Sequence, residues 1–177
     1  VEALQTCTSL EKLYLSGNDF SSAAAGLGSL SDWLQRHEVN LHELKLSHCR
    51  INDEGLHELF QGAANCEILD LDGNESITAT GLSYLYSSIR SDRCRLETLD
   101  LRGIPVGDDG MEVLARGLAG NKSVRSMYLG DSVDVSVTSA GWLAFSRALC
   151  DTSSVNSTYL SNHNICDIWD EDDGEFI

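Results

Sequence analysis

The sequence predicts an α/β fold: a right-handed solenoid with a curved parallel sheet inside and helices outside. Two observations predict it. A strand-like pattern, first seen as LEKLYLSGNDF from Leu10, occurs six times at a period of about 29 residues. A helical pattern follows most of these copies. Because neither half can bury its apolar side alone, stacked repeats have to share one core.

The strand half of each repeat is expected to point two leucines inward and the residue between them outward. In the first copy, Leu13 and Leu15 face the core and Tyr14 faces solvent, as the two-residue period of a strand requires. The six copies begin at Leu10, Leu41, Cys66, Leu96, Val124 and Val155. The strand core is expected to contain Leu13, Leu15, Leu44, Leu46, Leu69, Leu71, Leu99, Leu101 and Leu129.

The helix half of a repeat is indicated by apolar residues three and four positions apart, preceded by a glycine. In the second repeat, Leu56, Leu59 and Phe60 form one apolar stripe after Gly55. The first repeat lacks this glycine and carries an Ala-rich helix instead. Strands lie about 4.8 Å apart and helices are about 10 Å thick, so the stack has to curve with the sheet on its inner, concave face.

The repeats are expected to form one domain over residues 1–165. Residues 1–9 match the ends of the later helices, which indicates the end of a preceding helix and fits a segment of a longer protein. Residues 166–177 are expected to form an acidic C-terminal tail.

Composition excludes several classes of function. Twelve basic and 28 acidic residues give a net charge of −16, which disfavours nucleic acid and anionic membranes as partners. The six cysteines form no C-x-x-C pair, which favours reduced thiols and a cytoplasmic location. No nucleotide-binding or zinc-protease motif occurs and the five histidines are scattered, so we predict no metal, no cofactor and no catalytic residue.

The repeated blocks resemble leucine-rich repeats, with the pattern L-x-x-L-x-L-x-x-N/C-x-I/L. Their length and full helix are similar to those of the ribonuclease-inhibitor-like class, over the span from Leu10 to about Ile165. This resemblance implies the fold more strongly than the function, because the class includes inhibitors, GTPase activators, innate-immune sensor domains and actin-capping proteins.

The candidate binding site is the outward-facing row of strand residues on the concave face. An acidic centre of Asp70, Asp72 and Asp100 is expected to lie beside tyrosines, which fits a protein partner that brings Lys or Arg. A solvated strand face is the simpler interpretation of the same residues. The candidate partner-binding residues are Tyr14, Lys45, Asp70, Asp72, Asp100, Arg102, Tyr128 and Tyr159.

The sequence therefore predicts a non-catalytic protein–protein interaction module with a basic protein partner. The chain is expected to be a monomer, or a weak dimer through uncapped ends. Two alternatives stay open: a regulator of an enzyme, such as a GTPase activator that uses Arg102, and the sensing segment of a larger receptor.

Overall fold

The computed structural model describes residue 4 and residues 6–36, 39–130 and 137–170. It contains one six-stranded parallel sheet in which each strand pairs with the next along the chain. The strands are β1 (Lys12–Tyr14), β2 (Glu43–Lys45), β3 (Ile68–Asp70), β4 (Thr98–Asp100), β5 (Ser126–Leu129) and β6 (Asp167–Asp170). The helices are α1 (Ala24–Leu34), α2 (Asp53–Ala63), α3 (Ala79–Ile89), α4 (Gly107–Leu118), α5 (Ser139–Leu149) and α6 (Val155–Leu160).

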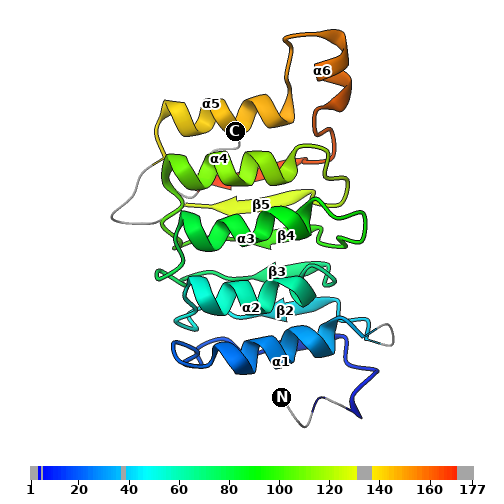
Figure 1. Cartoon of the computed structure of the whole chain (residues 1–177), viewed down its shortest axis with the longest axis vertical. Coiled ribbons are helices and arrows are strands. Elements are labelled where there is room, and N and C mark those ends of the chain that lie inside the picture. Colours follow the sequence, from blue (N-terminus) through cyan, green and yellow to red (C-terminus); the bar gives the residue numbers. More distant parts are fainter. Residues whose placement is uncertain (1–3, 5, 37–38, 131–136, 171–177) are drawn as a thin grey trace.

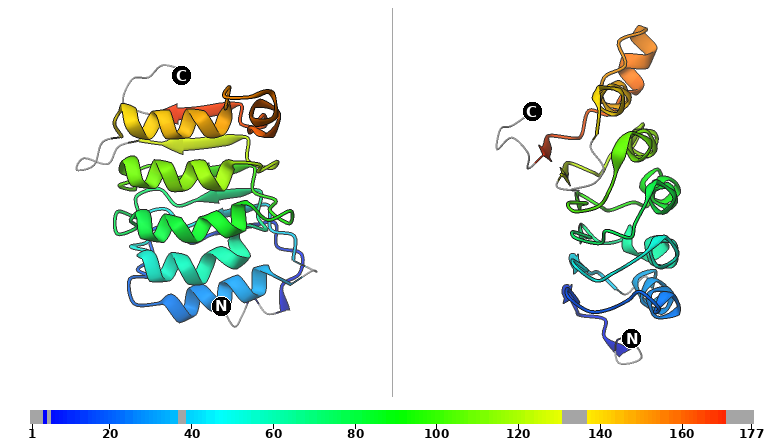
Figure 2. Two further views of the ribbon diagram at one scale, coloured as in Figure 1. Left: turned by 45° about the horizontal axis from the view of Figure 1, so that its top comes forward. Right: turned by 90° about the vertical axis from the view of Figure 1, so that its left-hand side faces the viewer.

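Strands and helices form two separate layers, as the repeat pattern predicts. The helices α1–α5 lie one above another in chain order (Figure 1). Seen from the side, the strands stack on one side of the molecule and the helices on the other (Figure 2). The sheet therefore lines one continuous face, which is the predicted concave face.

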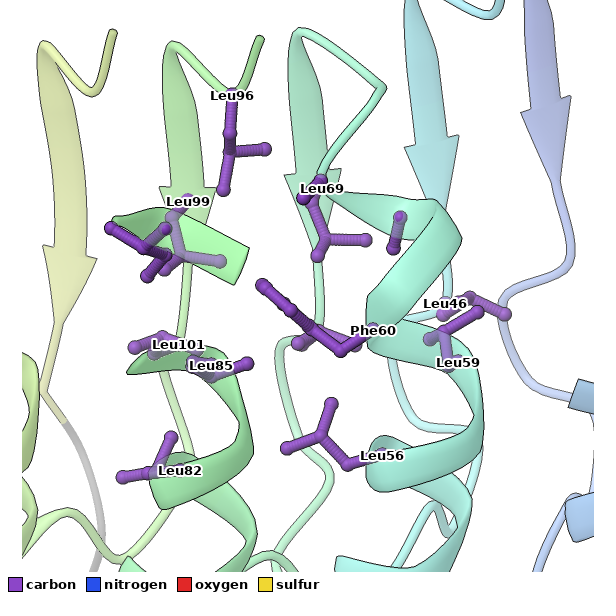
Figure 3. Close-up of a cluster of buried hydrophobic side chains, with 14 of the residues drawn as sticks. Leu46, Leu56, Leu59, Phe60, Leu69, Leu82, Leu85, Leu96, Leu99 and Leu101 are labelled. Atoms are coloured by element: carbon purple, nitrogen blue, oxygen red, sulfur yellow. The ribbon is translucent and has the colours of Figure 1, made fainter. Parts of the chain in front are cut away.

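The core lies between these two layers and runs through the repeats without a break. Strand leucines such as Leu69 and Leu99 meet helix residues such as Leu56, Phe60 and Leu85 (Figure 3). The predicted strand-core leucines of β2 to β5 are all buried. Leu13 and Leu15 are only partly buried, because they belong to the first strand of the sheet and pack against a repeat on one side.

The glycine at the start of the helices has a packing role between repeats. A Cβ atom on Gly141 would lie 2.6 Å from Oδ1 of Asp108 in the preceding helix. That carboxylate accepts hydrogen bonds from the backbone N–H and the hydroxyl of Thr138, the N-cap of α5, at 2.7 and 2.6 Å. Asp53 holds the α3 N-cap Thr78 in the same way. Gly therefore leaves room for a carboxylate that connects successive repeats.

The sixth repeat differs from its prediction. Residues 155–160, predicted as the sixth strand, form helix α6, and the sixth strand is β6, which pairs with β5. Residues 167–170 were assigned to the acidic tail from the sequence, and they belong to the sheet. The rest of that tail, residues 171–177, lies outside the described residues, as do residues 1–3 and 5 of the predicted preceding helix.

Asparagine side chains explain where the sixth repeat starts. Asn121 Oδ1 accepts hydrogen bonds from the backbone N–H groups of Ser123 and Val124, and its Nδ2 donates to the carbonyl of Ile89 at the end of α3. Asn162 Oδ1 likewise accepts from Asn164 and Ile165, and its Nδ2 donates to the carbonyl of Leu118 at the end of α4. Ile165 is thus the counterpart of Val124, and the repeat between them is 41 residues long.

Candidate protein-binding surface

Strand pairing places five of the predicted site residues in one row. The register joins Tyr14 to Lys45, Lys45 to Asp70, Asp70 to Asp100 and Asp100 to Tyr128. The row alternates along each strand with the buried leucines, so it faces away from the core. Its members differ in exposure, from 56% for Tyr14 to 8% for Asp100.

Tyr159 does not belong to this row, and its assignment to the concave face was wrong. It lies on α6, where its side chain is 81% exposed. The backbone position paired with Tyr128 is Trp169 of β6. The sequence was misleading here because VNSTYL alternates like a strand, while the hydrogen bonds that begin α6 depend on the serines around it.

Glu43 organises the end of the row at β1 and β2. The residue is buried, with 8% of its surface exposed. It accepts a 2.6 Å hydrogen bond from the Tyr14 hydroxyl and lies 3.1 and 3.2 Å from the ammonium groups of Lys12 and Lys45. The Tyr14 hydrogen bond is the largest cause that lowers the pKa of Glu43 to about 2, and burial partly opposes it. The Lys45 ammonium also lies 5.3 Å from the centre of the Tyr14 ring.

The sequence interpretation missed Glu43, although a signal for it was present. Glu43 is two residues before Lys45 on a strand, so both side chains have to face the same side of the sheet. The Glu43 carboxylate holds the Lys45 ammonium group in place. This end of the row is therefore ordered, with two ammonium groups around one carboxylate.

Arg102 and Asp100 form a second ion pair, near the end of the row at β5. The Arg102 guanidinium donates from Nε to Asp100 Oδ1 at 2.9 Å and from Nη2 to Oδ2 at 2.7 Å. The same guanidinium lies 5.6 Å from the centre of the Tyr128 ring. A two-pronged contact of this kind fixes the guanidinium plane, so Arg102 is positioned by Asp100 rather than free to reach outward.

Asp70 lies between these two groups of paired charges. It is half-buried, and its Oδ1 accepts a hydrogen bond from the backbone N–H of Asp72 at 3.0 Å. Burial is the first cause that raises the pKa of Asp70, and the nearby carboxylates of Asp100 and Asp72 raise it further. The ammonium group of Lys45, at the paired position on β2, lowers this pKa, but no cation lies within 4 Å of Asp70 in the described part of the chain. The centre of the row therefore holds a carboxylate without a close ion-pair partner among the described residues.

Asp72 adds to the negative charge of this centre. Its Oδ2 lies 3.6 Å from Nε2 of His48, whose ring packs over Gly73. His48 has a backbone φ of +53°, at a position where Gly17, Gly73 and Gly103 stand in three other repeats. Among the described residues, no group of three or more His, Cys, Asp or Glu side chains could hold a metal ion. The arrangement can bind a cationic group.

The geometry agrees with what comparison with known proteins finds. The family model described as Leucine Rich repeat matches residues 6–25, 37–60 and 94–115. Together with the alternating strands and helices of one parallel sheet, these matches define the class: the chain is a leucine-rich repeat protein.

Within that class, the chain is similar to a ribonuclease inhibitor. The chain is 30% identical to the ribonuclease inhibitor of Mus musculus over 132 residues, which cover 72% of this chain and 28% of the mouse protein. It is thus a leucine-rich repeat protein of the ribonuclease-inhibitor-like kind that spans less than a third of that relative's length. In the described part of the chain, no helix is long and apolar enough to span a membrane.

Proposed function

We propose that this chain is a non-catalytic interaction module that binds a basic protein partner on its concave face. The observation that carries the proposal is the half-buried Asp70 carboxylate, which lies between two ordered pairs and has no ion-pair partner within 4 Å among the described residues. The similarity to leucine-rich repeats and to a ribonuclease inhibitor supports a protein-binding role of this kind.

The partner is expected to place a Lys or Arg side chain against Asp70 and Asp72. A cation there relieves the repulsion between neighbouring carboxylates and lowers the pKa of Asp70. Tyr14 and Tyr128 are held by Glu43 and Arg102, so their rings offer contact area at little further loss of side-chain freedom. The net charge of −16 speeds the approach of a basic partner.

We also propose that the protein works in the cytoplasm, where thiols stay reduced. Cys49 and Cys66 are buried in the core as free thiols, and burial raises the pKa of Cys66 to about 12. A thiol of that kind is unreactive. Cys94, Cys150 and Cys166 are also free thiols.

The experiment that tests the binding site compares charge-neutral variants of similar shape. Asp70→Asn combined with Asp72→Asn removes the acidic centre and keeps the Asp100–Arg102 pair. Asp109→Asn changes the charge of an exposed residue on α4 and serves as the matched control. Affinity capture with quantitative mass spectrometry should lose basic partners only with the double variant. Equal recovery by all three proteins would place the binding site elsewhere.

The two alternatives remain predictions. A GTPase activator that uses Arg102 would need its guanidinium to leave Asp100, to which it donates hydrogen bonds from Nε and Nη2. Assays of GTP hydrolysis across small GTPases, comparing the wild type with Arg102→Ala, decide that question. The sequence of the full transcript on both sides of these 177 residues decides whether the chain is the sensing segment of a larger receptor.

A further inference from the structure

Helix α6 is an additional helix, whereas a regular repeat of this chain contains one strand and one helix. It lies in the 41-residue fifth repeat, whereas the four earlier intervals between repeat starts are 25 to 31 residues long. The helices α1–α5 are stacked side by side, and α6 stands at the end of the stack with its axis turned away from theirs (Figures 1 and 2). The solenoid therefore does not need α6 to complete its helix layer.

Two apolar side chains of α6 face solvent, which is the reverse of the usual arrangement. Val155 is 90% exposed and Tyr159 is 81% exposed. They are four residues apart on a helix and so lie on the same face. Neither has a hydrogen-bond, ion-pair or ring partner among the described residues. Burial within this chain cannot explain why these two positions are apolar.

The polar side chains of the segment hold the helix in place instead. Ser154 caps α6 by accepting from the Ser157 N–H at 3.0 Å. The Thr158 hydroxyl donates to the Asp151 carbonyl at 2.9 Å, and the Asp151 N–H donates to Ser161 Oγ at 2.8 Å. Asn162 joins the end of the segment to α4. The apolar pair is thus presented on a short helix that hydrogen bonds fix at both ends.

The lack of charged residues around α6 indicates what kind of partner surface this helix contacts. Residues 152–166 contain no Asp, Glu, Lys or Arg, in a chain of which 23% is charged. The cores of protein interfaces are depleted in charged residues and enriched in tyrosine. A charged partner surface would lose solvation here without gaining an ion pair.

We propose that α6 is a second protein-docking element, which inserts Tyr159 and Val155 into an uncharged apolar pocket of a protein other than this chain. It is separate from the acidic centre on the concave face and does not depend on the function proposed for that centre. The Tyr159 ring fills the pocket and its hydroxyl meets an acceptor there, since buried tyrosine hydroxyls usually have a partner.

The test places a photo-crosslinking benzophenone side chain at position 159 in cells, with position 86 on α3 as the matched control, because Tyr86 is also exposed. A protein that crosslinks from 159 and not from 86 is identified, purified and titrated against the chain. Val155→Ser with Tyr159→Ser should weaken its dissociation constant about tenfold or more. The concave variant Asp70→Asn with Asp72→Asn should leave it unchanged. Affinity should change little between about 50 and 500 mM NaCl.

The proposal is overturned by any of four results. These are no crosslink from 159 above the level at 86, crosslinking only to a second copy of this chain, an affinity unaffected by the serine substitutions, or an affinity that high salt abolishes. Because both replaced side chains are exposed, the variant should keep the wild-type melting temperature. This control separates lost docking from lost folding.

Discussion

The Tyr14 hydroxyl donates a 2.6 Å hydrogen bond to Glu43 Oε2, which joins strand β1 to strand β2 on the concave face. Glu43 also lies between two lysines, so its ionised form is favoured in the folded protein. The pKa of Glu43 falls from 4.5 to about 2 for these reasons.

The lowered pKa of Glu43 predicts how the free energy of unfolding depends on pH. A carboxylate with a lowered folded-state pKa stabilises the fold above its unfolded pKa, and that stability is lost as pH falls through the folded value. The difference in free energy of unfolding between the wild type and Glu43→Gln should therefore shrink between pH of about 4.5 and about 2. Urea unfolding of both proteins across this range measures it. A constant difference would contradict the role of Glu43.

Removing a carboxylate that connects two repeats should weaken the fold. Asp53→Ala leaves the N-cap residue Thr78 of the next repeat without two hydrogen bonds of 2.7 Å. We expect a loss of about 1–3 kcal/mol in the free energy of unfolding, measured by urea denaturation. Glu54→Ala, at the exposed neighbouring position, is the control and should cost much less. Equal losses for both would show that only helix-end charge matters.

Truncating a core leucine should cost more at the centre of the stack than at its first strand. Leu71 and Leu101 are fully buried, and replacing either by Ala should cost about 2–5 kcal/mol. Leu13 is only partly buried, so Leu13→Ala should cost less. Thermal and urea melts of the three variants give the order. Unchanged melting of Leu71→Ala or Leu101→Ala would disprove the repeat register.

His48 predicts a stabilising substitution. It is a non-glycine residue at φ +53°, where three other repeats use glycine with positive φ. His48→Gly should remove backbone strain and raise the free energy of unfolding by about 1 kcal/mol. Its exposed contact with Asp72, at 3.6 Å, contributes little against this gain. The converse change, Gly103→His, should destabilise the protein in the same assay.

Most of the fold could be predicted from the sequence because the signals are local and repeated. Leu44 and Leu46 mark an inward strand face, and Leu56 and Leu59 mark a helix stripe, without knowledge of distant contacts. The start of the sixth repeat could not be found in this way. VNSTYL satisfies the strand alternation, and only Asn162, which repeats the position and contacts of Asn121, reveals the true register.

The candidate site could be predicted in outline but not in its electrostatics. The row from Tyr14 to Tyr128 follows from strand period alone. The ion pairs depend on side-chain rotamers, which strand period does not determine. The rotamers place Arg102 against Asp100, and they place Lys12 and Lys45 against Glu43. The three aspartates therefore do not act alike, because Asp100 has an ion-pair partner and Asp70 has none within 4 Å among the described residues.

The amide of Asn162 makes the register of β6 independent of the length of the segment that precedes it. Because Asn162 fixes the start of β6 onto α4, the number of residues before Asn162 does not set the strand register. Foreign peptides grafted between Leu149 and Asn162 should thus leave the sheet unchanged. The molecule could serve as a scaffold in which the segment between Leu149 and Asn162 is exchanged while the sheet and the stacked helices stay the same.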